Sequence, residues 1–191
     1  MAFTEPPASA AWEHRDARTG FEVLRTNRRE DGWTLHGTTT AVEDGTAWTV
    51  EYVIEVDGGW RTRGARVTHP LNGRSVTLDR TADDGWLVDG RHDPGLDGCD
   101  DVDLESSAVT NALPVHRLRL DVGEAAQAPA AYVRAADLTV VRLEQSYERL
   151  PDADGRQRYA YAAPVFDFTA RLDYDESGFV LEYPGLAVRR A

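Results

Sequence analysis

WTVEYVIEVDGGWRTRGARV, residues 48–67, contains the alternation that decides the fold class. Its first nine residues place Trp48, Val50, Tyr52, Ile54 and Val56 on one face, with mainly polar side chains between them. A period of two is typical of an antiparallel strand that buries one face and exposes the other. The DGG that follows predicts a tight turn into a second strand.

The same pattern of strands and turns extends over most of the chain. Residues 33–90 predict a meander of about five strands, and a similar run returns in the second half. Two segments have the same order of residue types, namely Leu-Asp, an acidic turn that ends in glycine, and then an aromatic, two aliphatic and an acidic residue. They are VTLDRTADDGWLVDG (76–90) and TARLDYDESGFVLEYPG (169–185). We therefore predict a mainly β single domain over 1–191, with an internal duplication of about 33–92 and 132–186 joined by 93–131. The two meander units would form a curved antiparallel sheet, as a barrel or half-barrel.

Composition excludes several classes of function. The 191 residues have a formal net charge of −12, and arginine supplies all of the basic residues other than histidine. Such an acidic chain repels phosphate groups, so we expect no nucleic-acid partner and no attachment to anionic membranes. No segment approaches the roughly 20 apolar residues that span a bilayer, so we expect no stable membrane insertion. Cys99 is the one cysteine, and the first residues lack the pattern of a signal peptide. We expect a cytoplasmic protein and make no prediction of its oligomeric state.

The stretch LDGCDDVDLESSAVTNALPVHRL (96–118) is too long and too rich in functional groups for an ordinary connection. It does not match an EF-hand, because the sixth position from Asp97 is Val102 and the twelfth is Ala108. A different cation site at Asp97, Asp101 and Asp103 stays open, although we predict no metal and no cofactor. We interpret Cys99 as a small buried residue. If the segment is extended, His116 falls in phase with Leu118, which indicates a core or rim histidine.

This stretch resembles the bacterial glycolipid-binding protein family, formerly a domain of unknown function. The resemblance is carried by Gly98-Cys99, Asp101-Val102-Asp103-Leu104, Thr110-Asn111, Leu113-Pro114 and Arg117-Leu118. It continues through Gln145 and Tyr147 to GFVLEYPGL (178–186), and Ala108 departs from it where proline is expected. Membership implies a mostly β fold similar to the bacterial lipoprotein carriers, in which a curved sheet surrounds an apolar cavity. Fold alone does not establish the ligand.

The leading hypothesis is a non-enzymatic protein that binds an amphiphile, such as a glycolipid. Its apolar tails would lie among aromatic rings that otherwise simply fill the core: Trp33, Trp48, Tyr52, Trp60, Trp86, Phe166, Phe168 and Tyr174. Its polar head group would meet Asp101, Asp103, Asn111, Arg117, Gln145 and Tyr147. Carboxylates and amides suit this role because they hydrogen-bond to sugar hydroxyls.

Two alternatives stay open. An uncharacterised enzyme could use Asp101 and Asp103 as an acid and base pair on a sugar or small ester, since they lie about 7 Å apart on an extended strand. Alternatively, the central motif is purely structural and links the two repeats through a network of Asp–Arg and Asn–backbone interactions.

Overall fold

A computed structural model of the chain describes residues 3–16 and 18–191. The fold is mainly β, with 56% of the residues in strands and a large antiparallel sheet. The first half contains β1 (Ser9–His14), β2 (Thr19–Arg29), β3 (Gly32–Glu43), β4 (Thr46–Asp57), β5 (Thr62–His69), β6 (Arg74–Arg80), β7 (Trp86–Val88) and β8 (Arg91–His92). The central connection contains the 3-10 turns η1 (Pro94–Leu96) and η2 (Val109–Asn111), the strand β9 (Asp101–Leu104) and the helix α1 (Ala112–Leu118). The remainder contains β10 (Ala125–Gln127), β11 (Ala130–Val133), β12 (Val140–Leu143), β13 (Ser146–Ala153), β14 (Arg156–Ala163), the 3-10 turn η3 (Pro164–Phe166), β15 (Phe168–Tyr174), β16 (Val180–Tyr183) and β17 (Ala187–Arg189).

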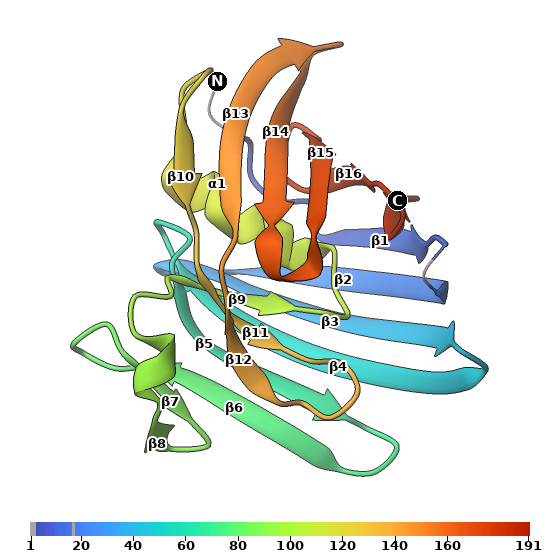
Figure 1. Ribbon diagram of the computed structural model, residues 1–191, viewed down its shortest axis with the longest axis vertical. Helices are drawn as coiled ribbons and strands as arrows, with labels where there is room; N and C mark the ends of the chain where they lie inside the picture. The colour runs from blue at the N-terminus through green and yellow to red at the C-terminus, as the bar shows by residue number, and fades with distance from the viewer. Residues whose placement is uncertain (1–2, 17) are drawn as a thin grey trace.

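The large sheet joins both halves of the chain. Its strand order is β10-β13-β14-β15-β16-β17-β1-β2-β3-β4-β5-β6-β7-β8. The halves meet where β1 pairs with β17, with Trp12 opposite Arg189. In Figure 1 the strands β13–β15 stand nearly upright, whereas β2–β6 run across the view, so the sheet turns strongly between its halves. A small sheet, in the order β12-β11-β9, lies against the lower half.

The expected alternation in 48–56 is confirmed. Val50, Tyr52, Ile54 and Val56 of β4 are buried, whereas the intervening Glu51 and Glu55 are exposed. The predicted five strands of the first meander correspond to β3–β7, and β8 extends them. Trp86 and Tyr174 are completely buried, so these predicted face residues fill the core.

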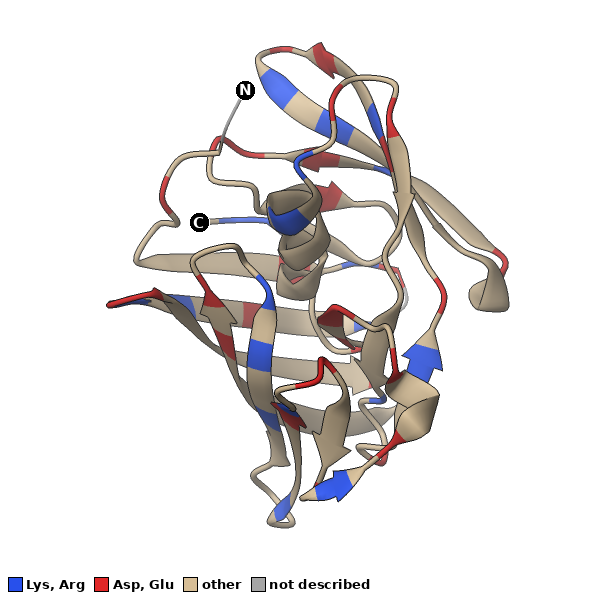
Figure 2. Ribbon diagram, turned by 90° about the vertical axis from the view of Figure 1, so that its left-hand side faces the viewer, with Lys and Arg blue, Asp and Glu red and all other residues tan. Residues whose placement is uncertain are grey.

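The connection between the halves fills the space enclosed by the sheet. Figure 2 shows α1 between the strands of the two halves. Val102, Val109, Leu113 and Val115 have no exposed surface. Burial of such side chains gives about 1.5–3 kcal/mol each, so this connection is a main part of the core.

The reading of His116 as part of an extended segment is wrong. Residues 112–118 form α1, which has Pro114 in its first turn, where a missing N–H costs little. Arg119 then ends the helix in the left-handed conformation, at φ 49°. His116 is nevertheless a buried core residue, as predicted: its Nε2 lies 2.9 Å from the Ser177 carbonyl oxygen, and its ring stacks on Trp60 at 3.7 Å.

The sheet is not a closed barrel. Within residues 3–16 and 18–191, β10 and β8 are its two edges and do not pair with each other. The large antiparallel sheet is confirmed, whereas the half-barrel stays a prediction. The duplication also stays a prediction. Residues 132–143 of its second unit contribute to the small sheet, and β1 and β2 join the large sheet outside both predicted units.

Gly37 is required by the packing of β3 against β4. It lies directly opposite Tyr52, and a Cβ added there would come 2.1 Å from Cζ of the buried tyrosine ring. We expect Gly37→Ala to displace this ring and to lower the free energy of unfolding by about 1–3 kcal/mol, measured by urea denaturation. Gly58→Ala is the matched control, because the nearest atom to its Cβ is 3.9 Å away. Equal stability of the two variants would contradict this packing.

Candidate functional site

The two predicted aspartates of β9 lie in different surroundings. Both carboxylate oxygens of Asp101 accept hydrogen bonds from Arg117, from Nε at 3.1 Å and from Nη2 at 2.6 Å. Asp103 accepts a hydrogen bond from Thr110 Oγ1 at 2.6 Å. Arg117 also lies 3.3 Å from Asp100, which pairs with Arg61 and Arg80. Asp101 and Arg117 are therefore part of an ionic network, whereas Asp103 lines the cavity described below.

The predicted Asn111 and Tyr147 are in contact. Tyr147 OH donates to Asn111 Oδ1 at 2.9 Å, and Tyr174 OH donates to the Asn111 backbone oxygen at 3.1 Å. Gln145, two residues before Tyr147, is also buried. Its Oε1 has no hydrogen-bond partner among the described residues. The structure thus brings Asp103 and Asn111 to one cavity, places Tyr147 against Asn111, and leaves Gln145 outside the cavity lining.

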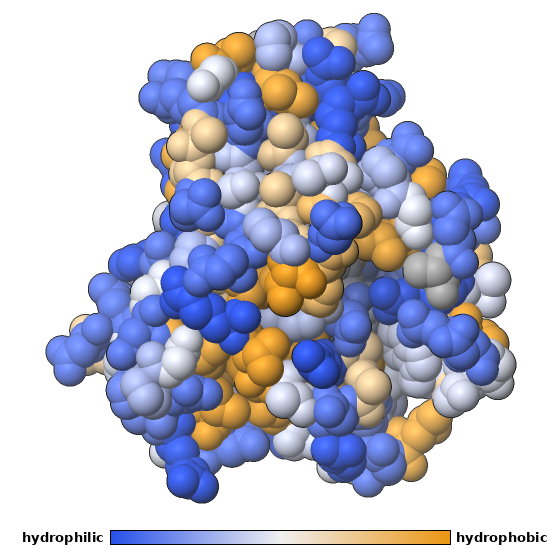
Figure 3. Space-filling model, viewed as in Figure 1, coloured by the Kyte–Doolittle hydropathy of each residue, from blue (hydrophilic) through white to orange (hydrophobic). Residues whose placement is uncertain are grey.

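A cavity of about 320 Å³ lies between the small sheet and the second half of the large sheet. Its walls are mostly aromatic or aliphatic: Tyr132, Leu143, Tyr161, Ala163, Phe166, Phe168, Tyr183 and Leu186. Phe166 is 53% exposed and also lines the cavity, so it lies at the opening. Figure 3 shows an apolar patch over the β14–β15 connection, which contains Phe166 and the exposed Val165, with hydrophilic residues around it.

Two buried polar side chains that line this cavity have unpaired atoms. His14 is 6% exposed and Arg18 is 9% exposed. Among the described residues, His14 Nε2 and Arg18 Nε and Nη1 have no hydrogen-bond partner. Arg18 Nη2 donates to the Glu105 carbonyl at 3.1 Å, and the guanidinium lies over Trp48. Unpaired buried polar atoms are costly, so a ligand that paired with them would gain affinity.

Burial shifts the titration of the groups around the cavity. It raises the pKa of Asp103 to about 6, an effect that the hydrogen bond from Thr110 opposes. It lowers the pKa of His14 to about 4, and the charge of Arg18 lowers it further. Burial also raises the pKa of Glu22, against hydrogen bonds from Ser107, Tyr52 and Ala108. At neutral pH the imidazole is therefore neutral, and Arg18 is the cation among these groups.

A second cavity, of about 500 Å³, is larger but has better paired polar groups. Its His116 contacts the Ser177 carbonyl, its Arg28 pairs with Glu5, and its Arg149 pairs with Asp152. We therefore take the smaller cavity as the candidate site, because unpaired buried groups indicate a missing partner better than volume does.

The alternative cation site at Asp97, Asp101 and Asp103 is not assembled. Asp97 is mostly exposed and lies 3.3 Å from His92, whereas Asp101 and Asp103 have the partners described above. In the described part of the chain, no group of three or more His, Cys, Asp or Glu side chains could hold a metal ion. Cys99 is completely buried, as predicted, and burial raises the pKa of its thiol to about 11.

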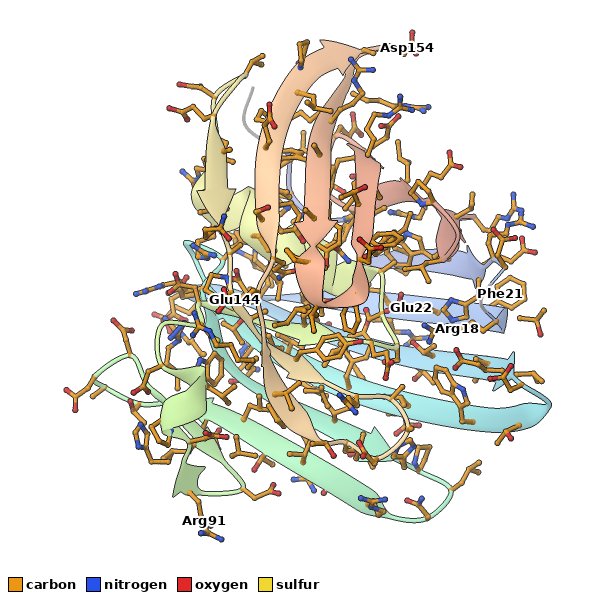
Figure 4. The ribbon with its side chains drawn as sticks, in the orientation of Figure 1. Arg18, Phe21, Glu22, Arg91, Glu144 and Asp154 are labelled. Atoms are coloured by element: carbon orange, nitrogen blue, oxygen red, sulfur yellow. The ribbon has the colours of Figure 1, made fainter. Side chains whose placement is uncertain are left out.

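Sequence reasoning missed His14, Arg18 and Glu22. Glu22 had a usable signal: in FEVLRT (21–26) it falls in phase with Leu24, and both are buried while Phe21 and Val23 are exposed. His14 had none, since the pairing of β1 with β17 sets it opposite Ala187 in the cavity wall, and Arg18 had none, since it lies in the connection between β1 and β2. Figure 4 shows Arg18 and Glu22 on the same side of the molecule, near the lower end of the β14–β15 hairpin.

The chain thus has the form of a large, strongly curved antiparallel sheet with a cavity lined by aromatic side chains. Residues 9–189 match the family model described as "Putative glycolipid-binding", and the chain belongs to this family. A crystal structure of a DUF1089 family protein from Pseudomonas aeruginosa is similar to it, with a TM-score of 0.74 and 29% sequence identity. The similarity covers 100% of this chain and 97% of that chain. No curated protein matches the sequence.

The buried Asp103 carboxylate makes stability depend on pH. Its folded-state pKa of about 6 is above the ordinary 3.8, so the folded chain holds this proton more tightly than the unfolded chain. The contribution of Asp103 to stability therefore falls as pH rises from about 4 to 6, by roughly 2–3 kcal/mol. We expect Asp103→Asn to melt several degrees above the wild type at pH 7.5 and to lose most of that advantage at pH 4.5. A melting-temperature difference that is the same at both pH values would contradict this assignment.

The Asp101–Arg117 pair tests the structural role of the motif. Burial raises the pKa of Asp101 and Arg117 lowers it, with burial the larger effect. We expect Arg117→Leu to cost about 3–5 kcal/mol, because it leaves a buried carboxylate without its partner. Arg61→Leu is the control, since its ion pair with Asp100 is partly exposed and worth less than about 1 kcal/mol. Thermal and urea unfolding measure both, and equal losses would contradict the prediction.

Proposed function

We propose that this protein binds an amphiphile of the glycolipid type in the 320 Å³ cavity. The single observation that carries the proposal is the coexistence of an aromatic wall with unpaired buried polar groups, His14 and Arg18, in one cavity. An apolar tail would lie against Tyr161, Phe166 and Phe168, close to the exposed apolar patch at the opening. The family description supports a glycolipid as the ligand.

The head group would contact Asp103 and Asn111, as expected from the sequence, together with His14 and Arg18. Tyr147 would act through Asn111 by holding its amide oxygen. Asp101 and Arg117 would support the site from the ionic network, and Gln145 would support it from the neighbouring interior. Neutral imidazole accepts and guanidinium donates, so together they suit the hydroxyl groups of a sugar.

The paired-aspartate enzyme has less support. Asp101 is held by both of its oxygens, which leaves it poorly placed to take a proton from a substrate.

Among the described residues, no helix is long and apolar enough to cross a membrane. The cytoplasmic location expected from the sequence stays a prediction.

Filling the cavity should abolish binding. Ala163 of β14 lines the cavity, and Ala163→Leu would add a larger side chain to its wall. We expect isothermal titration calorimetry with octyl glucoside, below its micelle concentration, to show at least tenfold weaker binding to Ala163→Leu than to the wild type. Ala162→Leu is the control, because its side chain lies on the other face of the same strand. Unchanged affinity in Ala163→Leu, or no binding by the wild type, would contradict the proposal.

A further inference from the structure

Ser107 lies beside a buried carboxylate at the edge of the cavity. Its Oγ donates a hydrogen bond to Glu22 Oε1. Glu22 is completely buried and comes from β2, 85 residues away in the sequence. Ser107 itself lines the cavity, so the hydroxyl lies between a carboxylate and the space where a ligand would bind.

The carboxylate is held in a fixed position. Tyr52 OH donates to Glu22 Oε1 at 2.6 Å, and the Ala108 backbone N–H donates to Oε2 at 2.8 Å. The Val109 N–H donates to Ser107 Oγ at 3.0 Å. A hydroxyl has one proton and two lone pairs, so one lone pair of Ser107 is left after these bonds. A nucleophile bonded to a base that is oriented by a third group is the arrangement used in covalent catalysis.

A cation with free donors lies next to this pair. Arg18 is anchored by Nη2 to the carbonyl of Glu105, two residues before Ser107, and its charge acts on Glu22. Its Nε and Nη1 have no partner among the described residues. Donors of this kind stabilise the negative oxygen that develops when a carbonyl group is attacked.

We propose that Ser107, Glu22 and Arg18 form an esterase site, in which Ser107 attacks an acyl ester bound in the cavity. Glu22 takes the hydroxyl proton as the Ser107 Oγ–carbon bond forms, and Arg18 binds the resulting oxyanion. The bond from carbon to the leaving oxygen then breaks, and that oxygen takes the proton from Glu22 and departs as an alcohol. Water cleaves the acyl-serine by the same route, so one ester and one water give one alcohol and one carboxylic acid. Tyr52 is a positioning residue.

The substrate class follows from the walls of the cavity. The acyl chain would lie against the aromatic side chains, and the alcohol portion would lie at the polar groups. The substrate part of this proposal rests on the amphiphile binding proposed above, whereas the serine chemistry does not.

A fluorophosphonate probe tests the nucleophile directly in the wild-type protein. We expect a single covalent adduct on Ser107, located by peptide mass spectrometry, together with hydrolysis of p-nitrophenyl butanoate. Ser107→Ala should lose both, and Glu22→Gln should hydrolyse the ester at least 100-fold more slowly. Ser177→Ala is the matched control, since Ser177 is a buried serine outside this cavity whose Oγ also donates to a carboxylate, that of Asp175, and this variant should keep labelling and turnover.

Three outcomes separate this proposal from the binding function. A wild type that binds octyl glucoside but is neither labelled on Ser107 nor active overturns the esterase and leaves the binding. Labelling of Ser107 without binding of octyl glucoside supports the esterase and overturns the binding. Turnover that persists in Ser107→Ala overturns the esterase assignment, and because the adduct is mapped in the wild type, this test does not depend on the folding of Glu22→Gln.

Discussion

The packing of the central connection inside the curved sheet is the constraint on which the rest of the structure depends. The connection brings apolar side chains such as Val109 and Leu113 into the space between the two halves. It is held there by polar contacts from both halves: Glu22 of β2 accepts from Ala108, and Tyr147 and Tyr174 donate to Asn111. A sheet with this curvature would otherwise expose a large apolar surface, which monomeric proteins avoid. The cavity is the part of this space that the connection leaves unfilled.

This arrangement explains why the polar groups of the motif have different roles. A polar side chain buried between a connection and a sheet must find a partner, or its loss of hydration destabilises the fold. Asp101 forms an ion pair with Arg117, and Asp103 accepts a hydrogen bond from Thr110. His14 and Arg18 are incompletely paired at the boundary of the cavity. The proposed ligand site therefore lies where the internal pairing of the core ends.

The sequence predicted the strands well, because the burial of alternate side chains in residues such as Tyr52 and Ile54 is a local property. It did not predict the helix at 112–118, since the even spacing of His116, Leu118 and Leu120 is the spacing of a strand. The family resemblance led to the prediction of Asp103 and Asn111 as site residues, and both line the cavity. The remaining cavity residues depend on pairing between distant strands, and periodicity along one segment has no information about such pairing.

The pairing of β1 with β17 also affects how the chain reaches its folded state. Trp12 and Arg189 are neighbours in the sheet although nearly the whole chain separates them. Contacts of such high sequence separation slow folding, because a long loop must close before they form. During synthesis on the ribosome, β1 has an open edge until β17 emerges, and unpaired edges favour aggregation. We therefore expect the two meanders to form early and their junction to form last.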